Sequence, residues 1–198
     1  MNRINRFFSK IPNWVFYILG PIPAIWLFYQ AINDKLGLDP VDRLEDQYGI
    51  WALQLIIAGL CVSPLRKIGL NLIKQRRPIG LLAFFYTCAH LLVWIWFDQG
   101  WDMSRIWTEI LKRPFITVGI VGFLLMFPLA VTSNNRAIRR IGPIKWRKLH
   151  LLTYPIAIIG AAHFLLVVKG WPLEPFIYLV VMLILLLMRP LWLNRSSS

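Results

Sequence analysis

The sequence has 198 residues, of which 58% are hydrophobic and only 16% are charged, and its mean hydropathy is +0.59. Ordinary soluble domains contain about 45–50% apolar and roughly 25% charged residues, so this composition argues against a soluble enzyme. The net charge of +13 comes from basic residues in short loops between apolar runs, which indicates contact with lipid headgroups and no nucleic-acid surface.

Six apolar segments approach the roughly 20 residues that an α-helix needs to cross a bilayer. They lie at 14–32, 49–66, 79–97, 115–132, 149–168 and 173–192. Backbone polar groups find no other partners in lipid, so each segment is expected to be helical. The first run is too long for a signal peptide and lacks a cleavage site, so we expect it to be retained. The sequence therefore predicts an all-α, polytopic membrane protein, a six-helix transmembrane bundle that forms a single domain over residues 1–198.

The loop charges predict the orientation of this bundle. Most of the 22 Lys and Arg residues lie before residue 14, after residue 192 and around the two loops at 67–78 and 133–148. The opposite loops carry all nine acidic residues, which are Asp34, Asp39, Asp42, Glu45, Asp46, Asp98, Asp102, Glu109 and Glu174. Because positive loops stay in the cytoplasm, both termini are expected to be cytoplasmic.

All three histidines lie in or at the edge of these spans, where ionisable residues are candidates for function. His90 and His163 fall on the third and fifth spans at nearly the same depth, roughly 8–10 Å below the outer surface. Thr87 and Ala83 share the helical face of His90, and Gly160 and Ile156 share that of His163. Small neighbours leave room for a flat group. Two opposed histidines without acidic partners suit the axial positions of a haem iron better than a bare zinc ion.

His150 lies 13 residues before His163, about 20 Å lower along the helix and beside the basic loop. No fourth histidine exists to oppose it on a second haem. It is either one ligand of such a haem or an interfacial hydrogen-bonding residue. The basic loop itself is either a topology signal or an anchor for haem propionates or a flavin phosphate.

Five segments resemble one known family of membrane proteins. They are LDP at 38–40, AHLLVW in the third span, KRPFITVGI at 112–120, LAVTSNNRAIRRIGPIKWRKLHLLTY at 129–154 and AAHFLLVVK at 161–169. In this order and over essentially the whole chain, they are similar to the MsrQ (YedZ) family. The broader kin are the ferric-reductase-like transmembrane domains.

The resemblance implies a haem-b subunit of a bacterial methionine sulfoxide reductase system in the inner membrane. Such a subunit passes electrons from the quinone pool to MsrP, a periplasmic molybdopterin enzyme that repairs oxidised envelope proteins. The substrate-reducing step is then expected on the partner subunit. The family's haem-linked histidines carry over onto His90, His150 and His163, and FMN is implied by the resemblance alone. Four-histidine kin hold two haems, but here the position that would oppose His150 is Arg76 or Arg77, so the number of haems stays open.

Two other functions remain compatible with the sequence. One is a stand-alone ferric-chelate reductase, or a quinol-linked superoxide-handling oxidoreductase, of the same fold. The other is a small transporter or assembly factor in which the histidines carry protons. A haem spectrum would distinguish the transporter or assembly factor, which needs no haem, from the redox functions. The identity of the electron acceptor would distinguish the stand-alone oxidoreductase from the MsrQ function.

Overall fold

The computed structural model describes residues 3–170 and 172–193, and every regular element within them is a helix. In chain order these are α1 (Arg3–Lys10), α2 (Asn13–Leu19), α3 (Ile22–Ile32), α4 (Pro40–Lys67), η1 (Ile73–Gln75), α5 (Arg76–Val93), η2 (Trp94–Asp98), α6 (Met103–Lys112), α7 (Pro114–Val131), α8 (Asn135–Ile141), α9 (Pro143–Leu149), η3 (His150–Leu152), α10 (Thr153–Val167) and α11 (Leu173–Leu193). The all-α prediction is confirmed.

Five helical stretches are long and apolar enough to cross a membrane. They are Asn13–Ile32, Pro40–Lys67, Ile73–Asp98, Pro114–Val131 and Pro143–Val167, and α11 adds a shorter apolar stretch at Leu173–Met188. The chain is therefore a multi-pass membrane protein, and the sixth pass stays a prediction.

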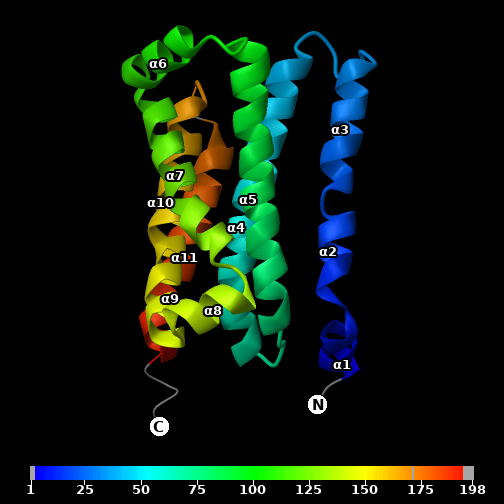
Figure 1. Cartoon of the computed structure of the whole chain (residues 1–198), viewed down its shortest axis with the longest axis vertical. Helices are drawn as coiled ribbons and strands as arrows, with labels where there is room; N and C mark the ends of the chain where they lie inside the picture. The colour runs from blue at the N-terminus through cyan, green and yellow to red at the C-terminus, as the bar shows by residue number, and fades with distance from the viewer. Residues whose placement is uncertain (1–2, 171, 194–198) are drawn as a thin grey trace.

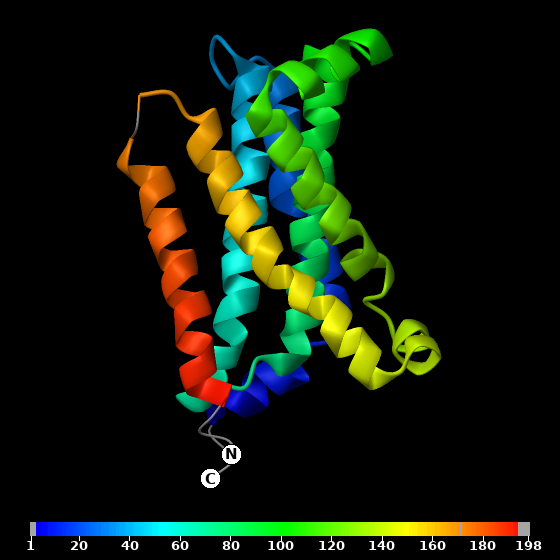
Figure 2. The same ribbon diagram turned by 90° about the vertical axis from the view of Figure 1, so that its left-hand side faces the viewer.

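The long helices run side by side along the bundle (Figure 1), while α6 lies across one end and α8 across the other. The described chain begins and ends at the same end of the bundle, with α1 and the last turns of α11 on opposite sides of it (Figure 1 and Figure 2). The acidic residues predicted for one side lie on α4, η2, α6, α11 and the connections at the end that α6 covers. Most basic loop residues lie at the opposite end, and which end faces the cytoplasm stays a prediction.

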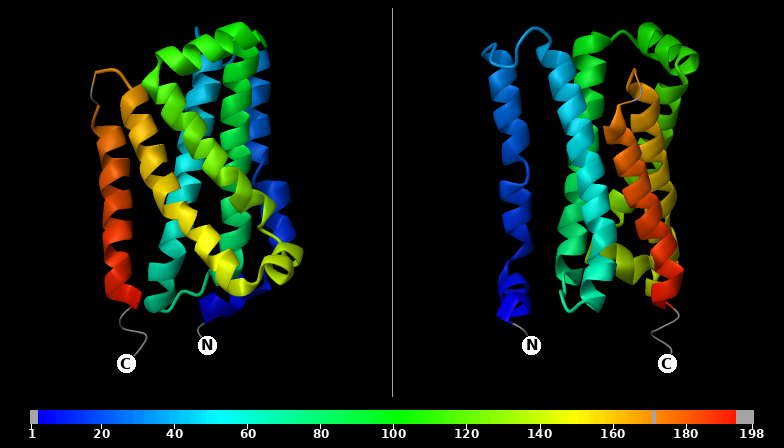
Figure 3. Two further views of the ribbon diagram at one scale, coloured as in Figure 1. Left: turned by 60° about the vertical axis from the view of Figure 1, so that its left-hand side comes forward. Right: turned by 180° about the vertical axis from the view of Figure 1, so that it is seen from behind.

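The first apolar segment is broken between α2 and α3 and stands beside the rest of the bundle (Figure 3). Pro21 lies at the break and cannot donate a helical hydrogen bond. Two buried tyrosines bridge this segment to the bundle. Tyr86 donates its hydroxyl to the carbonyl oxygen of Gly20, and Tyr48 donates to that of Ala24, each at 2.7 Å. These bonds fasten α2 and α3 without leaving polar groups unpaired in lipid.

Small buried residues let the central helices approach closely. Ala83 on α5 is 1% exposed, and Ala157 and Ala161 on α10 are fully buried. Small side chains at helix contacts are typical of membrane bundles, where close backbone approach replaces the hydrophobic driving force. The helix that contains the predicted span 49–66 begins earlier, at Pro40, because proline at the first position and Asp42 in the first turn favour a helix start. This extension places Glu45 on the helix, one turn before Gly49 and beside α5.

Candidate functional site

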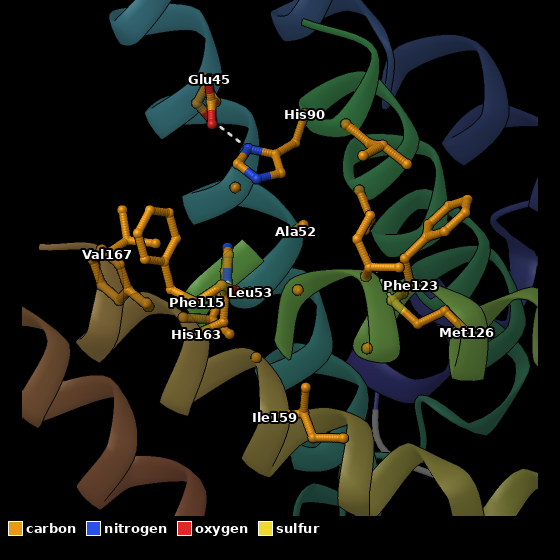
Figure 4. A pocket seen from close by; sticks show the side chains of 18 of the residues that line it. Glu45, Ala52, Leu53, His90, Phe115, Phe123, Met126, Ile159, His163 and Val167 are labelled. Carbon is orange, nitrogen blue, oxygen red and sulfur yellow. Dashed lines mark hydrogen bonds between the residues drawn. The ribbon is translucent and has the colours of Figure 1, made fainter. Parts of the chain in front are cut away.

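His90 and His163 project into one cavity between α4, α5, α7 and α10 (Figure 4). We call it the paired-histidine cavity. Its remaining wall is mostly apolar and includes Thr87 and Gly160, which the sequence placed on the faces of the two histidines. Ile156 also lines this cavity, whereas Ala83 lines a second one nearer the other end of the bundle. The faces predicted from helical spacing therefore point inward.

His90 is fixed by the neighbouring helix α4. Its Nδ1 lies 2.8 Å from the backbone carbonyl oxygen of Glu45. A carbonyl oxygen can only accept a hydrogen bond, so Nδ1 carries the ring proton. Nε2 of the neutral ring then keeps its lone pair, which is the form that binds a metal.

His163 is fixed by α7 through the same kind of contact. Its Nδ1 lies 2.8 Å from the backbone carbonyl oxygen of Phe115, so this ring also keeps a free lone pair on Nε2. Hydrogen bonds from the second ring nitrogen to a carbonyl oxygen are the usual support of a metal-bound histidine. Both rings are thus held in the tautomer and orientation of a metal ligand.

The centroids of the two rings are spaced as those of two imidazoles that share one metal would be. Their centroids are 6.1 Å apart, and their planes are nearly perpendicular at 83°. Two imidazoles that bind one metal through Nε2, each at about 2.0 Å, place their ring centres about 6 Å apart. The pair predicted from equal depth is therefore brought together, and its spacing fits the two axial positions of one iron.

Two glycines make room for the rings. A Cβ atom on Gly49 would lie 3.2 Å from Nδ1 of His90, and one on Gly119 would lie 2.8 Å from Cε1 of His163. Each glycine follows by four residues the carbonyl that its histidine contacts, so it lies one helical turn further along the same face. The helix pairs α4–α5 and α7–α10 thus hold their histidines in the same way. In each pair, one helix supplies a carbonyl oxygen that accepts from the ring and a glycine one turn later that makes room for it.

His150 lies apart from this pair, on the wall of the second cavity. Its ring stacks on Trp146 at 3.9 Å between centroids, and its Nε2 lies 3.1 Å from Oγ1 of Thr132. The Thr132 hydroxyl also lies 2.6 Å from the carbonyl oxygen of Pro128. The ring of His150 is thus held between Trp146 and Thr132, and its tautomer decides whether Nε2 donates to the hydroxyl or accepts from it.

Within residues 3–170 and 172–193, no three His, Cys, Asp or Glu side chains gather to hold a metal ion.

Sequence reasoning missed the groups that orient the histidines. The carbonyl oxygens of Glu45 and Phe115 carry no side-chain signature. Gly49 and Gly119 gave the only available signal, because a glycine inside an apolar helix often marks a close approach.

Comparison with known proteins assigns the family. The sequence model of the ferric reductase like transmembrane component matches residues 47–161. Over 178 residues, the chain is 47% identical to the protein-methionine-sulfoxide reductase heme-binding subunit MsrQ of Brucella ovis, and equally to those of Brucella canis and Brucella suis. The alignment covers 89% of this chain and 80% of each relative. The chain belongs to the MsrQ family.

This assignment confirms the resemblance that the sequence motifs carry, and with it the ferric-reductase-like membrane fold. The segment that matches the family model contains His90 and His150 and ends shortly before His163. No solved structure matches the chain significantly.

The Gly119→Ala substitution should destabilise the protein by about 1–3 kcal/mol, because the added methyl group overlaps the His163 ring, which its hydrogen bond holds in place. Gly80→Ala on α5 is the matched control, since a Cβ there meets no heavy atom within 4 Å and helix propensity favours alanine. The measurement is the apparent unfolding free energy in mixed detergent. Equal stability of the two variants would contradict the close approach at Gly119.

Proposed function

We propose that this chain is the haem-b membrane subunit of a methionine sulfoxide reductase system, with His90 and His163 as the axial ligands of one haem iron. The spacing of the two rings carries this proposal, and their carbonyl-bound Nδ1 atoms support it. The relatives' name, heme-binding subunit, supports the same cofactor. When bound, haem supplies a centre that gains and loses one electron at a time.

The chain's own residues orient the two histidine rings and exclude water from the paired-histidine cavity. The carbonyl oxygens of Glu45 and Phe115 hold the ring protons on Nδ1, so neither histidine needs to lose a proton in order to bind. Apolar side chains such as Leu53, Ile116 and Phe123 line the remaining wall and exclude water. The cavity measures about 180 Å³, and these side chains would surround a group held by the two histidines.

The subunit transfers electrons across the bacterial inner membrane, from the quinone pool to a periplasmic molybdopterin-containing, MsrP-like reductase. Both chain ends are then cytoplasmic, and the paired-histidine cavity lies toward the periplasm. The acidic end of the bundle would meet the partner, whose docking its charges steer. The basic loops at the other end support this orientation.

We propose one haem, between His90 and His163. A second haem would have His150 as its one histidine ligand, because α5 carries Arg76 and Arg77 where the opposing histidine would lie. Nε2 of His150 lies 3.1 Å from Oγ1 of Thr132. FMN follows from the family resemblance alone, and no residue is assigned to it.

Alanine substitutions separate the three histidines. His90→Ala and His163→Ala should each lose most of the b-type haem absorbance of the purified protein, because one axial ligand is removed. His150→Ala is the internal control and should keep the haem-to-protein ratio of the wild type. A full haem spectrum in both His90→Ala and His163→Ala would contradict the assignment of these histidines as ligands. Wild type without haem would instead favour the transporter or assembly function.

The electron acceptor separates the proposed function from the other redox function. Protein reduced with a quinol analogue should be reoxidised rapidly by an MsrP-like reductase supplied with methionine sulfoxide. Ferric chelates and superoxide should reoxidise it more slowly, because they lack a docking surface complementary to the acidic end. The measurement is the rate of haem reoxidation in stopped flow. Faster reoxidation by a ferric chelate would favour the stand-alone reductase.

A further inference from the structure

Gln54 is an exposed polar residue in the middle of a membrane-spanning helix. It lies about halfway along the 28 residues of α4, in the stretch from Gly49 to Leu65, which carries no charged residue. Between Gln47 and Val62 it is the one residue of α4 whose side chain is exposed. Polar side chains at this depth are costly in hydrocarbon and are candidates for function. This surface of α4 therefore presents an amide to the lipid in the middle of an otherwise apolar helix.

The amide is paired with a tyrosine of α11. Nε2 of Gln54 donates to the hydroxyl oxygen of Tyr178 at 2.8 Å, where α4 and α11 lie side by side (Figure 3). A tyrosine hydroxyl both donates and accepts, so the pair keeps a hydroxyl proton that it can donate and an amide Oε1 that can accept. Within the described part of the chain, no other residue hydrogen-bonds to either side chain. The pair thus offers a free donor and a free acceptor beside each other.

The pair lies directly behind the wall of the paired-histidine cavity. Leu53, which precedes Gln54 in the chain, lines that cavity. Phe164, which follows His163, lines it as well. The ring of Phe164 meets the ring of Tyr178 edge-on, with centroids 5.6 Å apart. A single layer of side chains would therefore separate the cavity from a group bound at the pair.

These surroundings define the chemistry of a ligand. It must be lipid-soluble, because the pair is reached from within the apolar part of α4 and α11. It must be uncharged, because no Lys, Arg, Asp or Glu lies between Gly49 and Leu65 or between Pro175 and Met188, so a charge would be unpaired there. Its polar group must accept a hydrogen bond from a hydroxyl and, in one of its states, donate one to an amide oxygen.

A quinone meets all three requirements. Its head group is a flat ring with two carbonyl oxygens, which gain two protons and two electrons to become the hydroxyls of the quinol. The head group is uncharged in both of these states, and its tail is apolar.

We infer that Gln54 and Tyr178 form a binding site for the head group of a membrane quinone. The Tyr178 hydroxyl donates to an oxygen of the head group, and Oε1 of Gln54 accepts from the same oxygen when it is a hydroxyl. The tail stays in the lipid. The inference rests on the proposed function for the role of the quinone as electron donor, whereas the binding itself requires no haem.

The alternative is a hydrogen bond that only fastens α11 to α4. Bonds between transmembrane helices do stabilise membrane bundles. A bond with that role alone is best placed between the helices, where no atom of it meets lipid, but the side chain of Gln54 is exposed. The exposed amide favours a site that a ligand completes.

Photo-labelling of the purified full chain with a short-tailed azidoquinone tests the site. The label should attach to the peptides of α4 and α11 that contain Gln54 and Tyr178, and excess decylubiquinone should displace it. Tyr178→Phe and Gln54→Leu should each weaken displaceable labelling about fivefold, because each removes one hydrogen bond to the head group. Tyr17→Phe, which removes an exposed hydroxyl from α2, is the matched control and should label as wild type does.

Tyr178→Phe keeps the ring that contacts Phe164, so a loss of labelling in this variant reports the hydroxyl and not the packing. Unchanged labelling in both site variants would overturn the inference and leave the pair as a helix contact. Labels that map to other helices would overturn it as well. His90→Ala should bind the quinone as wild type does, because the pair uses neither histidine. Wild type that lacks haem but is labelled at the pair would therefore contradict the proposed function and not this site.

Discussion

The hydrogen bonds from His90 and His163 to backbone carbonyl oxygens are the constraint on which the paired-histidine cavity depends. A histidine in an apolar bundle must keep its ring N–H paired, and a carbonyl oxygen satisfies it without introducing a charge. The same bond fixes which nitrogen stays bare and where it points. Because Gly49 and Gly119 lie one turn beyond these carbonyls, each ring can lie against its neighbouring helix. In both helix pairs, a backbone carbonyl oxygen and the glycine four residues later thus orient the histidine ring.

The bundle keeps its two cavities chemically distinct. Ile56, Met126 and Ile156 line both cavities and form the layer between them. On one side, two histidines lie in a mostly apolar wall that also includes Glu45 and Asp46. On the other side, arginines and lysines line the cavity together with His150, and no acidic residue of the described chain does so. Most of the basic loop residues lie at this second end of the bundle, opposite the acidic residues.

Much of this arrangement could be predicted from the sequence, because membrane helices are read from length and hydropathy, and depth follows from the rise per residue. That reasoning placed His90 beside His163 and separated His150 from both. It could not find the carbonyl oxygens of Glu45 and Phe115, since any residue type supplies a carbonyl and only the packing selects one. It also placed the start of the second helix too late, because the polar segment from Pro40 carries a helix that hydropathy does not detect. The hydrogen bond of His150 to Thr132 joins two helices and has no local pattern.

In the proposed site, one iron lies between two imidazoles whose planes are nearly perpendicular, at 83°. Electron paramagnetic resonance of the oxidised, purified protein tests this most directly. Perpendicular imidazole planes leave two iron d orbitals nearly equal in energy, so the spectrum should be a strongly anisotropic low-spin ferric signal with one large g value. It should disappear in His90→Ala and persist in His150→Ala. A rhombic signal of parallel ligand planes would contradict the carbonyl-fixed ring orientations, and a high-spin signal in wild type would contradict the paired ligation itself.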